Sequence, residues 1–198
     1  MPSTDLQSAI SRKVRESASV SARFFEDSQP LIERIAFEMA ARFADQGKLF
    51  VMGNGGSACD AEHVAVEFMH PIYEKRIPLP AYALSGNTAL VTAVANDVDF
   101  SRVYATQLER LAGERDICLV LTTSGMSANL VEAVRQAKRM GMMTVAFSGK
   151  DGGRLNDLVD YNLVVPSYSI HRIQEAHVLL LHVVWDVVHC QMGAEDII

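Results

Sequence analysis

The chain has 198 residues, 49% of them hydrophobic and 21% charged, which is typical of one packed domain and not of a disordered segment. A net charge of −6 argues against a general nucleic-acid binder, because such a protein needs a basic surface. Three cysteines without a CxxC motif exclude a disulfide framework, and the polar N-terminus has no signal-peptide core. The longest apolar run, Val178 to Val188, is too short to cross a membrane. We therefore expect a cytoplasmic protein that binds neither nucleic acid nor membrane.

Two helical patterns come first in the chain. Apolar residues recur every four positions over residues 6–18, and a second apolar stripe follows over residues 32–43. Pro30 stands at the start of the second pattern, where a helix tolerates its missing N–H. The sequence predicts two helices within residues 1–46, and we expect this arm to pack on the core and on neighbouring subunits.

After this arm, short apolar segments alternate with helical patterns. Strands that are apolar throughout and that alternate with helices form a parallel sheet covered on both faces. The sequence therefore predicts a single α/β domain over residues 1–198. Strands are expected at 48–52, 79–84, 117–121, 143–147 and 161–165, and helices at 57–69, 87–96, 103–111, 128–140 and 170–191.

Loops rich in Gly, Ser, Thr and Asn follow several of these strands. Ligands of an open parallel sheet bind outside the carboxyl ends of the strands, where residues 53–57, 85–88, 122–127 and 149–153 would lie. Tight turns use the same residue types, but several such loops on one rim favour close approach of the backbone to a ligand. The loop at 122–127 carries four hydroxyls before a helix N-terminus at Ser127, which suits a phosphate group, although a plain capping turn is the alternative.

The loop Gly53-Asn54-Gly55-Gly56-Ser57-Ala58 also matches the dinucleotide fingerprint G-x-G-x-x-G/A. That fingerprint requires an acidic residue at the end of the second strand. This chain has Ser85 and Gly86 there, so the sequence argues against a nicotinamide or flavin cofactor.

Two pairs of residues could carry chemistry. His63 and Glu67 lie four residues apart on one helix face, and the spacing fits a metal half-site, a general acid–base pair or a plain surface pair. Gln174 and His182 share a stripe of the last helix but lie about 12 Å apart along its axis. They cannot easily meet at one atom, so either Gln174 lies in an irregular first turn or the two residues serve different copies of a site. His177 falls on the apolar stripe and is expected in the core.

Five segments of the chain resemble the sugar isomerase (SIS) domain family, and within it the phosphoheptose isomerase branch. They are GNGGSACDAEHVAVEF, AVANDVDF, TTSGMSANLVEAV, GKDGG and RIQEAHVLLLH. The resemblance implies one SIS domain, a flavodoxin-like three-layer sandwich around a five-stranded parallel sheet, and a homotetramer with active sites between subunits. It implies a bound zinc ion and a phosphosugar aldose–ketose isomerase that converts sedoheptulose 7-phosphate to D-glycero-D-manno-heptose 7-phosphate through an enediol.

The resemblance also implies roles for individual residues. Glu67 and His182 would carry the acid–base chemistry, although whether Glu67 acts as the base or mainly as a metal ligand stays open. The zinc ligands would be His63, Glu67, Gln174 and His182. The substrate would contact Asn54, Gly55, Gly56, Ser57, Glu67, Asn96, Asp97, Thr122, Thr123, Ser124, Ser127 and Gln174.

One position departs from the usual pattern of the branch. Four residues after Glu67, where the branch usually has an arginine, this chain has Pro71, which we expect to end the helix. Either a neighbour supplies the missing charge, with Lys75 and Arg76 as the nearest candidates, or the loop at 122–127 holds the phosphate alone. Some family members lack the His/Glu pair and bind the replication initiator or sense a sugar phosphate. Because this chain keeps the pair, we expect an enzyme.

Overall fold

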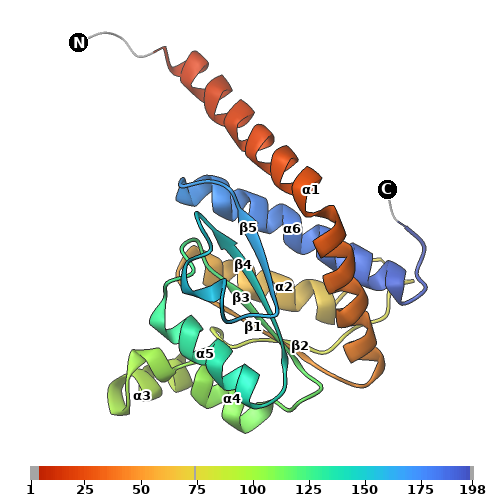
Figure 1. The fold of residues 1–198 in the computed structure, drawn as a ribbon, viewed down its shortest axis with the longest axis vertical. Coiled ribbons are helices and arrows are strands. Elements are labelled where there is room, and N and C mark those ends of the chain that lie inside the picture. The colour runs from red at the N-terminus through yellow and green to blue at the C-terminus, as the bar shows by residue number, and fades with distance from the viewer. Residues whose placement is uncertain (1–4, 74, 197–198) are drawn as a thin grey trace.

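A five-stranded sheet with the order β2-β1-β3-β4-β5 forms the middle layer of the computed structural model (Figure 1). The structure describes residues 5–73 and 75–196. Every neighbouring pair of strands is parallel, and β1, β3 and β4 are buried along their whole length, as expected for strands covered on both faces. The strands are β1 (Leu49–Gly53), β2 (Ala81–Ala83), β3 (Ile117–Leu121), β4 (Met143–Gly149) and β5 (Tyr161–Val165).

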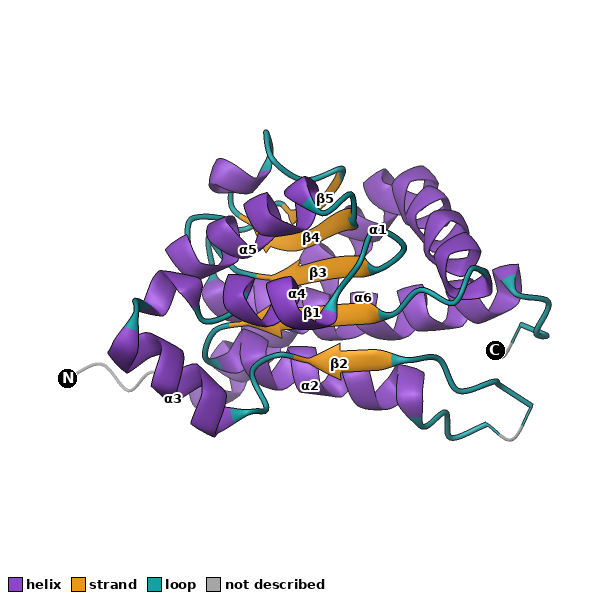
Figure 2. Cartoon of the chain, turned by 90° about the horizontal axis from the view of Figure 1, so that it is seen from below, coloured by secondary structure: helices purple, strands orange, loops and turns teal. Residues whose placement is uncertain are grey.

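Helices cover both faces of the sheet (Figures 1 and 2). One face packs against α1 (Leu6–Ala44), α2 (Gly56–Met69) and α6 (Ile170–Gln191). The other face packs against α3 (Thr88–Asp97), α4 (Ala105–Leu111) and α5 (Ala128–Arg139). Two short 3₁₀ helices, η1 (Phe100–Arg102) and η2 (Gly153–Leu155), complete the described elements. The strand order is that of flavodoxin-like folds, so the predicted fold class is confirmed.

The prediction of two N-terminal helices is wrong, because α1 is one continuous helix of 39 residues with Pro30 inside it. Proline removes one hydrogen bond of the helix and disfavours its continuation. The apolar residues on both sides of the proline nevertheless face the same core: Val20 and Phe24 before it, and Ile32 and Ile35 after it, are all buried. Tertiary packing of this shared face therefore outweighs the local cost of the proline.

The first turns of α1 project beyond the layered body (Figure 1). Leu6, Ile10 and Val14 lie on this projecting part and are 63% to 70% exposed. Apolar side chains in a row on one helix face mark a surface suited to a protein partner. Within residues 5–73 and 75–196, no helix is both long enough and apolar enough to cross a membrane.

Candidate active site

A cavity of about 210 Å³ lies at the carboxyl ends of β1 and β3. Gly53, the last residue of β1, is paired with Leu121, the last residue of β3, so the loops after these strands meet. Residues predicted to contact the substrate therefore line this cavity from both loops and from α6. Its lining residues are Asn54, Ser57, Leu121, Thr122, Thr123, Ser124, Ser127, Leu130, Ile170 and Gln174.

The hydroxyl groups that line this cavity differ in their hydrogen bonds. The Thr122 hydroxyl accepts the backbone N–H groups of Ser124 at 3.3 Å and Gly125 at 3.2 Å, and so folds the loop. Ser127 is the N-cap of α5, as predicted, yet among the described residues its side chain makes no capping hydrogen bond. Its hydroxyl therefore stays available to an anion at the positive end of the helix.

The loop after β4 supports the hydroxyl loop by close backbone contact. Gly125 has a φ of +65°, and a Cβ there would lie 2.0 Å from the carbonyl oxygen of Gly152. Gly153 has a φ of +54°, and a Cβ there would lie 2.4 Å from the carbonyl oxygen of Ser124. Only glycine fits such an approach, which explains Gly125 and the second glycine of the GKDGG segment, Gly153.

Asn54 is tied to α5 through a pair of amide hydrogen bonds. Its Nδ2 donates to Oδ1 of Asn129 at 3.0 Å, and Nδ2 of Asn129 donates to Oδ1 of Asn54 at 2.8 Å. Asn129 is buried and was missed by sequence reasoning. The sequence pattern that could have identified Asn129 is a polar residue on the apolar face of a predicted helix, since a buried polar group needs a hydrogen-bond partner.

A second group of polar side chains lies where α2 passes α6. Nε2 of His63 lies 3.3 Å from Oε1 of Glu67, and the ring centroids of His63 and His182 are 4.9 Å apart. One nitrogen or oxygen of each of the three residues lies within 4.8 Å of the others. Two imidazoles and one carboxylate are the protein ligands of many catalytic zinc sites, which keep a fourth position open. The surface-pair alternative for His63 and Glu67 does not account for the approach of His182.

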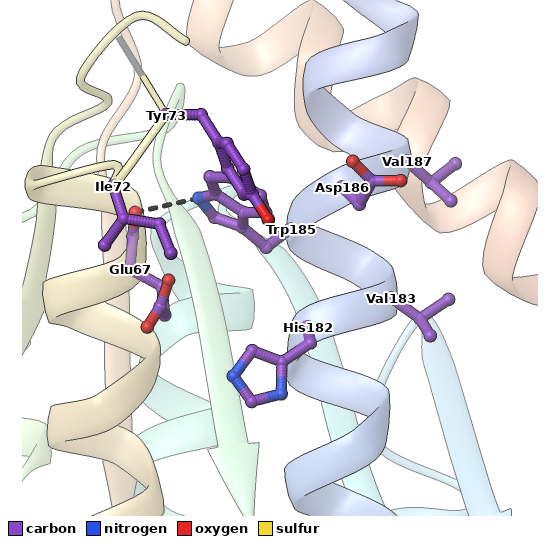
Figure 3. Close-up of a pocket in the computed structure, with 8 residues that line it drawn as sticks. All are labelled: Glu67, Ile72, Tyr73, His182, Val183, Trp185, Asp186 and Val187. Carbon is purple, nitrogen blue, oxygen red and sulfur yellow. Dashed lines mark hydrogen bonds between the residues drawn. The ribbon is translucent and has the colours of Figure 1, made fainter. Parts of the chain in front are cut away.

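A cavity of about 360 Å³ opens beside Glu67 and His182 (Figure 3). Figure 3 shows the Glu67 side chain reaching from α2 and that of His182 from α6 toward the space between the helices. The rings of Tyr73 and Trp185, 6.3 Å apart, form an aromatic wall. The lining residues are Glu67, Ile72, Tyr73, His182, Val183, Trp185, Asp186 and Val187.

Gln174 lies with the hydroxyl cavity and not with His182 in this chain. A Cβ on Gly56 would lie 2.6 Å from Nε2 of Gln174, and Gly56 is seven residues before His63, about 10 Å along α2. Helix α6 is regular from Ile170 onward, so the idea of an irregular first turn at Gln174 is wrong.

The predicted contacts Asn96 and Asp97 lie at the end of α3 and line neither of these two cavities. Both are exposed, and Nδ2 of Asn96 donates to Oδ1 of Asp97 at 2.8 Å. Gly55 and Gly56 form the turn into α2 beside the hydroxyl cavity, where Gly55 has a φ of +58°.

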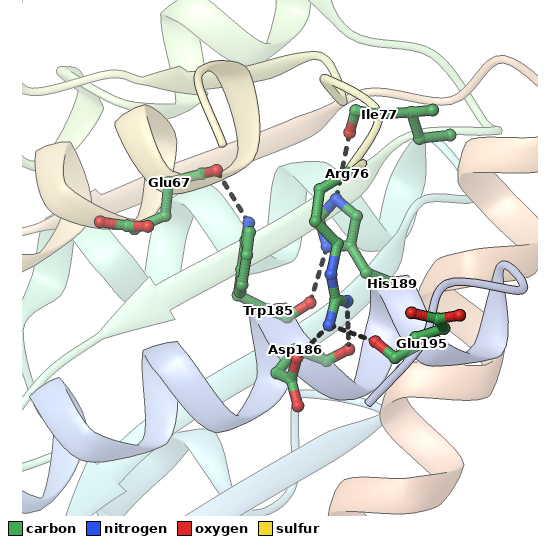
Figure 4. A network of polar contacts seen from close by, with 7 residues as sticks. All are labelled: Glu67, Arg76, Ile77, Trp185, Asp186, His189 and Glu195. Atoms are coloured by element: carbon green, nitrogen blue, oxygen red, sulfur yellow. Dashed lines mark hydrogen bonds and ion pairs between the residues drawn. The ribbon is translucent and has the colours of Figure 1, made fainter. Parts of the chain in front are cut away.

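Arg76, one of the two candidates for the missing charge, is engaged elsewhere in this structure. Its side chain is buried and forms an ion pair with Asp186 in the second half of α6 (Figure 4). Lys75 is exposed, with Nζ 3.4 Å from Oε2 of Glu195. Neither residue lines the hydroxyl cavity. Pro71 follows the last helical residue of α2 by two positions, in line with its expected role as a stop.

His177 is in the core, as predicted, with Nε2 3.0 Å from the carbonyl oxygen of Ser148. Burial lowers the pKa of His177 to about 4, so the ring is neutral at pH 7. Asp60 lies one turn before His63, and partial burial raises the pKa of its carboxyl, while the nearby His63 opposes this shift. Neither residue lines a cavity with Glu67.

Comparison with known proteins places this architecture in a family. A family model described as "SIS domain" matches residues 14–149. A phosphoheptose isomerase of Roseiflexus sp. (strain RS-1) is 41% identical over 187 residues, which are 94% of this chain and 95% of that protein. A phosphoheptose isomerase of Thermodesulfovibrio yellowstonii is 39% identical, over 93% of this chain and 92% of that protein.

Solved structures agree with the sequence relatives. The structure of a phosphoheptose isomerase from Francisella tularensis is similar with a TM-score of 0.91 and 35% identity, covering 94% of this chain and 100% of that one. The structure of a phosphoheptose isomerase from Neisseria gonorrhoeae has a TM-score of 0.88 and 33% identity, covering 96% and 100%. The chain therefore belongs to the SIS domain family, in its phosphoheptose isomerase branch.

Proposed function

We propose that the chain converts sedoheptulose 7-phosphate to D-glycero-D-manno-heptose 7-phosphate, with Glu67 and His182 as its acid–base pair. Membership of the phosphoheptose isomerases makes it an aldose–ketose isomerase. The non-catalytic alternative, a family member that binds the replication initiator or senses a sugar phosphate, is not favoured. The relatives are isomerases, and the His63 and Glu67 pair is kept.

The placement of two cavities along α6 is the observation that supports this substrate. Gln174 lies in the hydroxyl cavity and His182 in the cavity beside Glu67, eight residues or about 12 Å farther along the helix. Seven bonds separate C2 of a heptose 7-phosphate from its phosphorus. By the reach of an extended chain they span roughly 8 Å. With a contact of about 3 Å at each end, such a substrate is long enough to join the two cavities.

The hydroxyl cavity would hold the phosphate. The described lining has hydroxyl, amide and aliphatic side chains but no lysine or arginine. Binding of the phosphate would therefore depend on the Ser127 and Ser124 hydroxyls and the start of α5. Gln174, which lines the same cavity, would then contact the carbon chain of the sugar. This arrangement fits a phosphosugar in a protein of net charge −6.

The reaction would take place between Glu67 and His182. The Glu67 carboxylate takes a proton from C1 of the ketose and His182 supplies a proton to O2, which gives the enediol. Glu67 then returns its proton to C2, and His182 takes the proton from O1, which leaves the aldose. The same cavity, which Glu67 and His182 line together with aromatic and aliphatic side chains, would hold the reacting carbons.

We also propose that His63, Glu67 and His182 hold a zinc ion. Their two nitrogens and one carboxylate oxygen lie close enough together to bind one ion, which supports the fit. When bound, zinc would polarise the substrate carbonyl. A glutamate that binds zinc is a weaker base, so the two roles of Glu67 need not operate at once.

We propose a homotetramer with shared active sites. Asn96 and Asp97 line neither of the two cavities described above, and a site shared with a second subunit would let them contact the substrate. The exposed apolar face of α1, with Leu6, Ile10 and Val14, offers a surface for such an assembly.

The test is turnover of sedoheptulose 7-phosphate by the purified chain, followed as formation of the aldose by NMR. It is run with added Zn²⁺ and after treatment with a chelator, because the two conditions separate isomerisation from its need for metal. Formation of the heptose aldose supports the proposal. A chain that binds the substrate without converting it under either condition would be a non-catalytic member of the family.

A further inference from the structure

Three carbonyl oxygens in the last turn of α2, which carries Glu67, each accept a hydrogen bond from a different donor. The carbonyl of Val66 accepts the backbone N–H of His70 at 2.8 Å, within the helix. The carbonyl of Phe68 accepts the backbone N–H of Leu79 at 2.8 Å, from the chain that returns toward β2. Between these two lies the carbonyl of Glu67 itself.

The Glu67 carbonyl receives its hydrogen bond from a side chain. In a continuing helix its donor would be the N–H of residue 71, but Pro71 has none and turns the chain out of the helix. The indole Nε1 of Trp185 donates to this oxygen instead, at 2.8 Å (Figure 4). A carbonyl at a helix end that is removed from water needs such a partner. This hydrogen bond joins Trp185 to the backbone from which the Glu67 carboxylate extends.

Trp185 is held in turn by Arg76. The guanidinium carbon lies 5.1 Å from the centroid of the indole, and the Arg76 side chain is 1% exposed. Its Nη2 pairs with the carboxylate of Asp186 and donates to the carbonyl oxygen of Glu195 at 2.9 Å, while Nη1 donates to the carbonyl oxygen of Asp186 at 3.1 Å. A buried cation with this many partners has one orientation, and the indole packs against its face.

The same network also contacts Ile77, in the segment between α2 and β2. Nδ1 of His189 lies 2.8 Å from the carbonyl oxygen of Trp185, and Nε2 of His189 lies 3.1 Å from that of Ile77 (Figure 4). The ring of His189 packs against the indole, with centroids 4.7 Å apart. Trp185 is therefore confined on two sides, by Arg76 and by His189.

We propose that Trp185 is a positioning residue for Glu67, and that Arg76 keeps Trp185 in place. The inference rests on the isomerase function proposed above. Trp185 acts through the backbone of Glu67, while the proton transfers belong to the carboxylate. A displacement of the last turn of α2 would move that carboxylate away from C1 and from His63 and His182. It would leave the phosphate cavity, at the other end of α6, unchanged.

The matched variants are Trp185→Phe and Leu108→Ala. Trp185→Phe keeps an aromatic ring against Arg76 and deletes the N–H, whereas Leu108→Ala removes buried carbon on α4, on the opposite face of the sheet. In Trp185→Phe we expect kcat for sedoheptulose 7-phosphate to fall by roughly 10- to 100-fold with KM nearly unchanged. We expect its affinity for Zn²⁺, measured by competition with a chelator, to fall by roughly tenfold. Leu108→Ala should lower the melting temperature and change neither quantity.

Arg76→Lys is a second variant that keeps the charge beside Asp186 but loses the planar group over the indole. Trp185 is the single tryptophan of the chain, so its fluorescence reports this site alone. We expect a shift of the emission maximum in Arg76→Lys, together with a lower kcat. Wild-type kcat and wild-type Zn²⁺ affinity in both variants would overturn the proposal, as would an equal loss of kcat in Leu108→Ala.

Hydrogen exchange separates this inference from the proposed function. Amides in the last turn of α2 should exchange faster in Trp185→Phe than in the wild type, and Leu108→Ala should not change them. If the wild-type chain proves inactive, the proposed function fails, while the exchange rates still decide whether Trp185 holds the backbone of Glu67. Unchanged exchange at residues 66–70 in Trp185→Phe would refute the positioning role.

Discussion

Gln174 and His182, eight residues apart on α6, line two different cavities of the same chain. The helix between them is regular, so their separation of about 12 Å is fixed by the rise of the helix. Gln174 lies beside the glycine turn that begins α2, and His182 lies beside Glu67 near the end of α2. In the proposed function, the pair of helices α2 and α6 would therefore set the distance between the phosphate end and the reacting end of the substrate.

The first prediction concerns Glu67. Glu67→Gln keeps the size of the side chain but removes the carboxylate that we propose takes the C1 proton. Turnover of sedoheptulose 7-phosphate should fall by roughly 10²- to 10⁴-fold, with the fold unchanged by circular dichroism. Glu62→Gln, on an exposed position of the same helix, is the control and should keep full activity. Near wild-type turnover in Glu67→Gln would exclude the catalytic role.

Much of the fold could be predicted from the sequence because buried strands and amphipathic helices leave strong local patterns. The strands at 117–121 and 161–165 and the helix at 170–191 have the predicted bounds. The second strand is shorter than predicted and begins at Ala81, because Pro80 has no N–H for the sheet and β2 is an edge strand. The continuous helix α1 was not predicted because Pro30 indicates a helix start in the sequence. The core contacts on both sides of Pro30, which keep the helix continuous, depend on tertiary packing.

The candidate site could be predicted only in part. Loops at strand ends and the spacing of His63 and Glu67 are local features, and the family resemblance gave them roles. The partners of Glu67 and Asn54 are not local. Trp185 lies 118 residues after Glu67, and Asn129 lies 75 residues after Asn54. Such contacts depend on how α5 and α6 pack on the sheet, which no short segment of the sequence encodes.

The second prediction concerns metal. Protein purified without chelator should contain about one Zn²⁺ per chain, because three donors from one chain suit a catalytic zinc site. His63→Ala should lose the metal, and His171→Ala, at an exposed position of α6, should keep it. Elemental analysis of the three proteins measures this directly. Full activity of a metal-free wild-type protein would show that turnover does not need zinc.

The third prediction concerns the hydroxyl cavity. Ser127→Ala removes a hydroxyl that is not used to cap α5, so the fold should be unaffected. Loss of one hydrogen bond to a charged group costs about 1.5–3 kcal/mol, and KM should therefore rise roughly 10- to 100-fold with kcat little changed. Ser127→Thr keeps the hydroxyl and serves as the control. A KM that stays at the wild-type value in Ser127→Ala would remove Ser127 from the phosphate site.

The fourth prediction concerns assembly. Deletion of residues 1–28 would also remove Val20 and Phe24 from the core, so substitutions on the projecting part of α1 are the cleaner test. The double variant Ile10→Ser, Val14→Ser should lower the assembly state below a tetramer in analytical ultracentrifugation. It should lose activity at the same time if the sites are shared. Arg15→Ser, an exposed polar position of α1, should do neither. A fully active monomer in the double variant would contradict shared sites.

The last prediction concerns the pH dependence of stability through His177. Burial lowers the pKa of His177 from 6.5 to about 4, so the folded state keeps the ring neutral where the unfolded chain already binds a proton. Between about pH 6.5 and 4 the unfolded state therefore holds the extra proton, and the free energy of unfolding falls as the pH falls through this window. The total loss is roughly 3 kcal/mol, since each unit of pKa is worth about 1.36 kcal/mol.

Urea unfolding of the wild type and of His177→Leu at pH 7, 5 and 4 measures this contribution. His177→Leu loses the contact with the Ser148 carbonyl and should be less stable than the wild type at pH 7. The difference between the two should shrink as the pH falls, because only the wild type loses the contribution of the buried neutral ring. His171→Ala, at an exposed position, should follow the wild-type curve. Parallel curves for the wild type and His177→Leu would mean that His177 binds a proton as readily in the folded state as in the unfolded one.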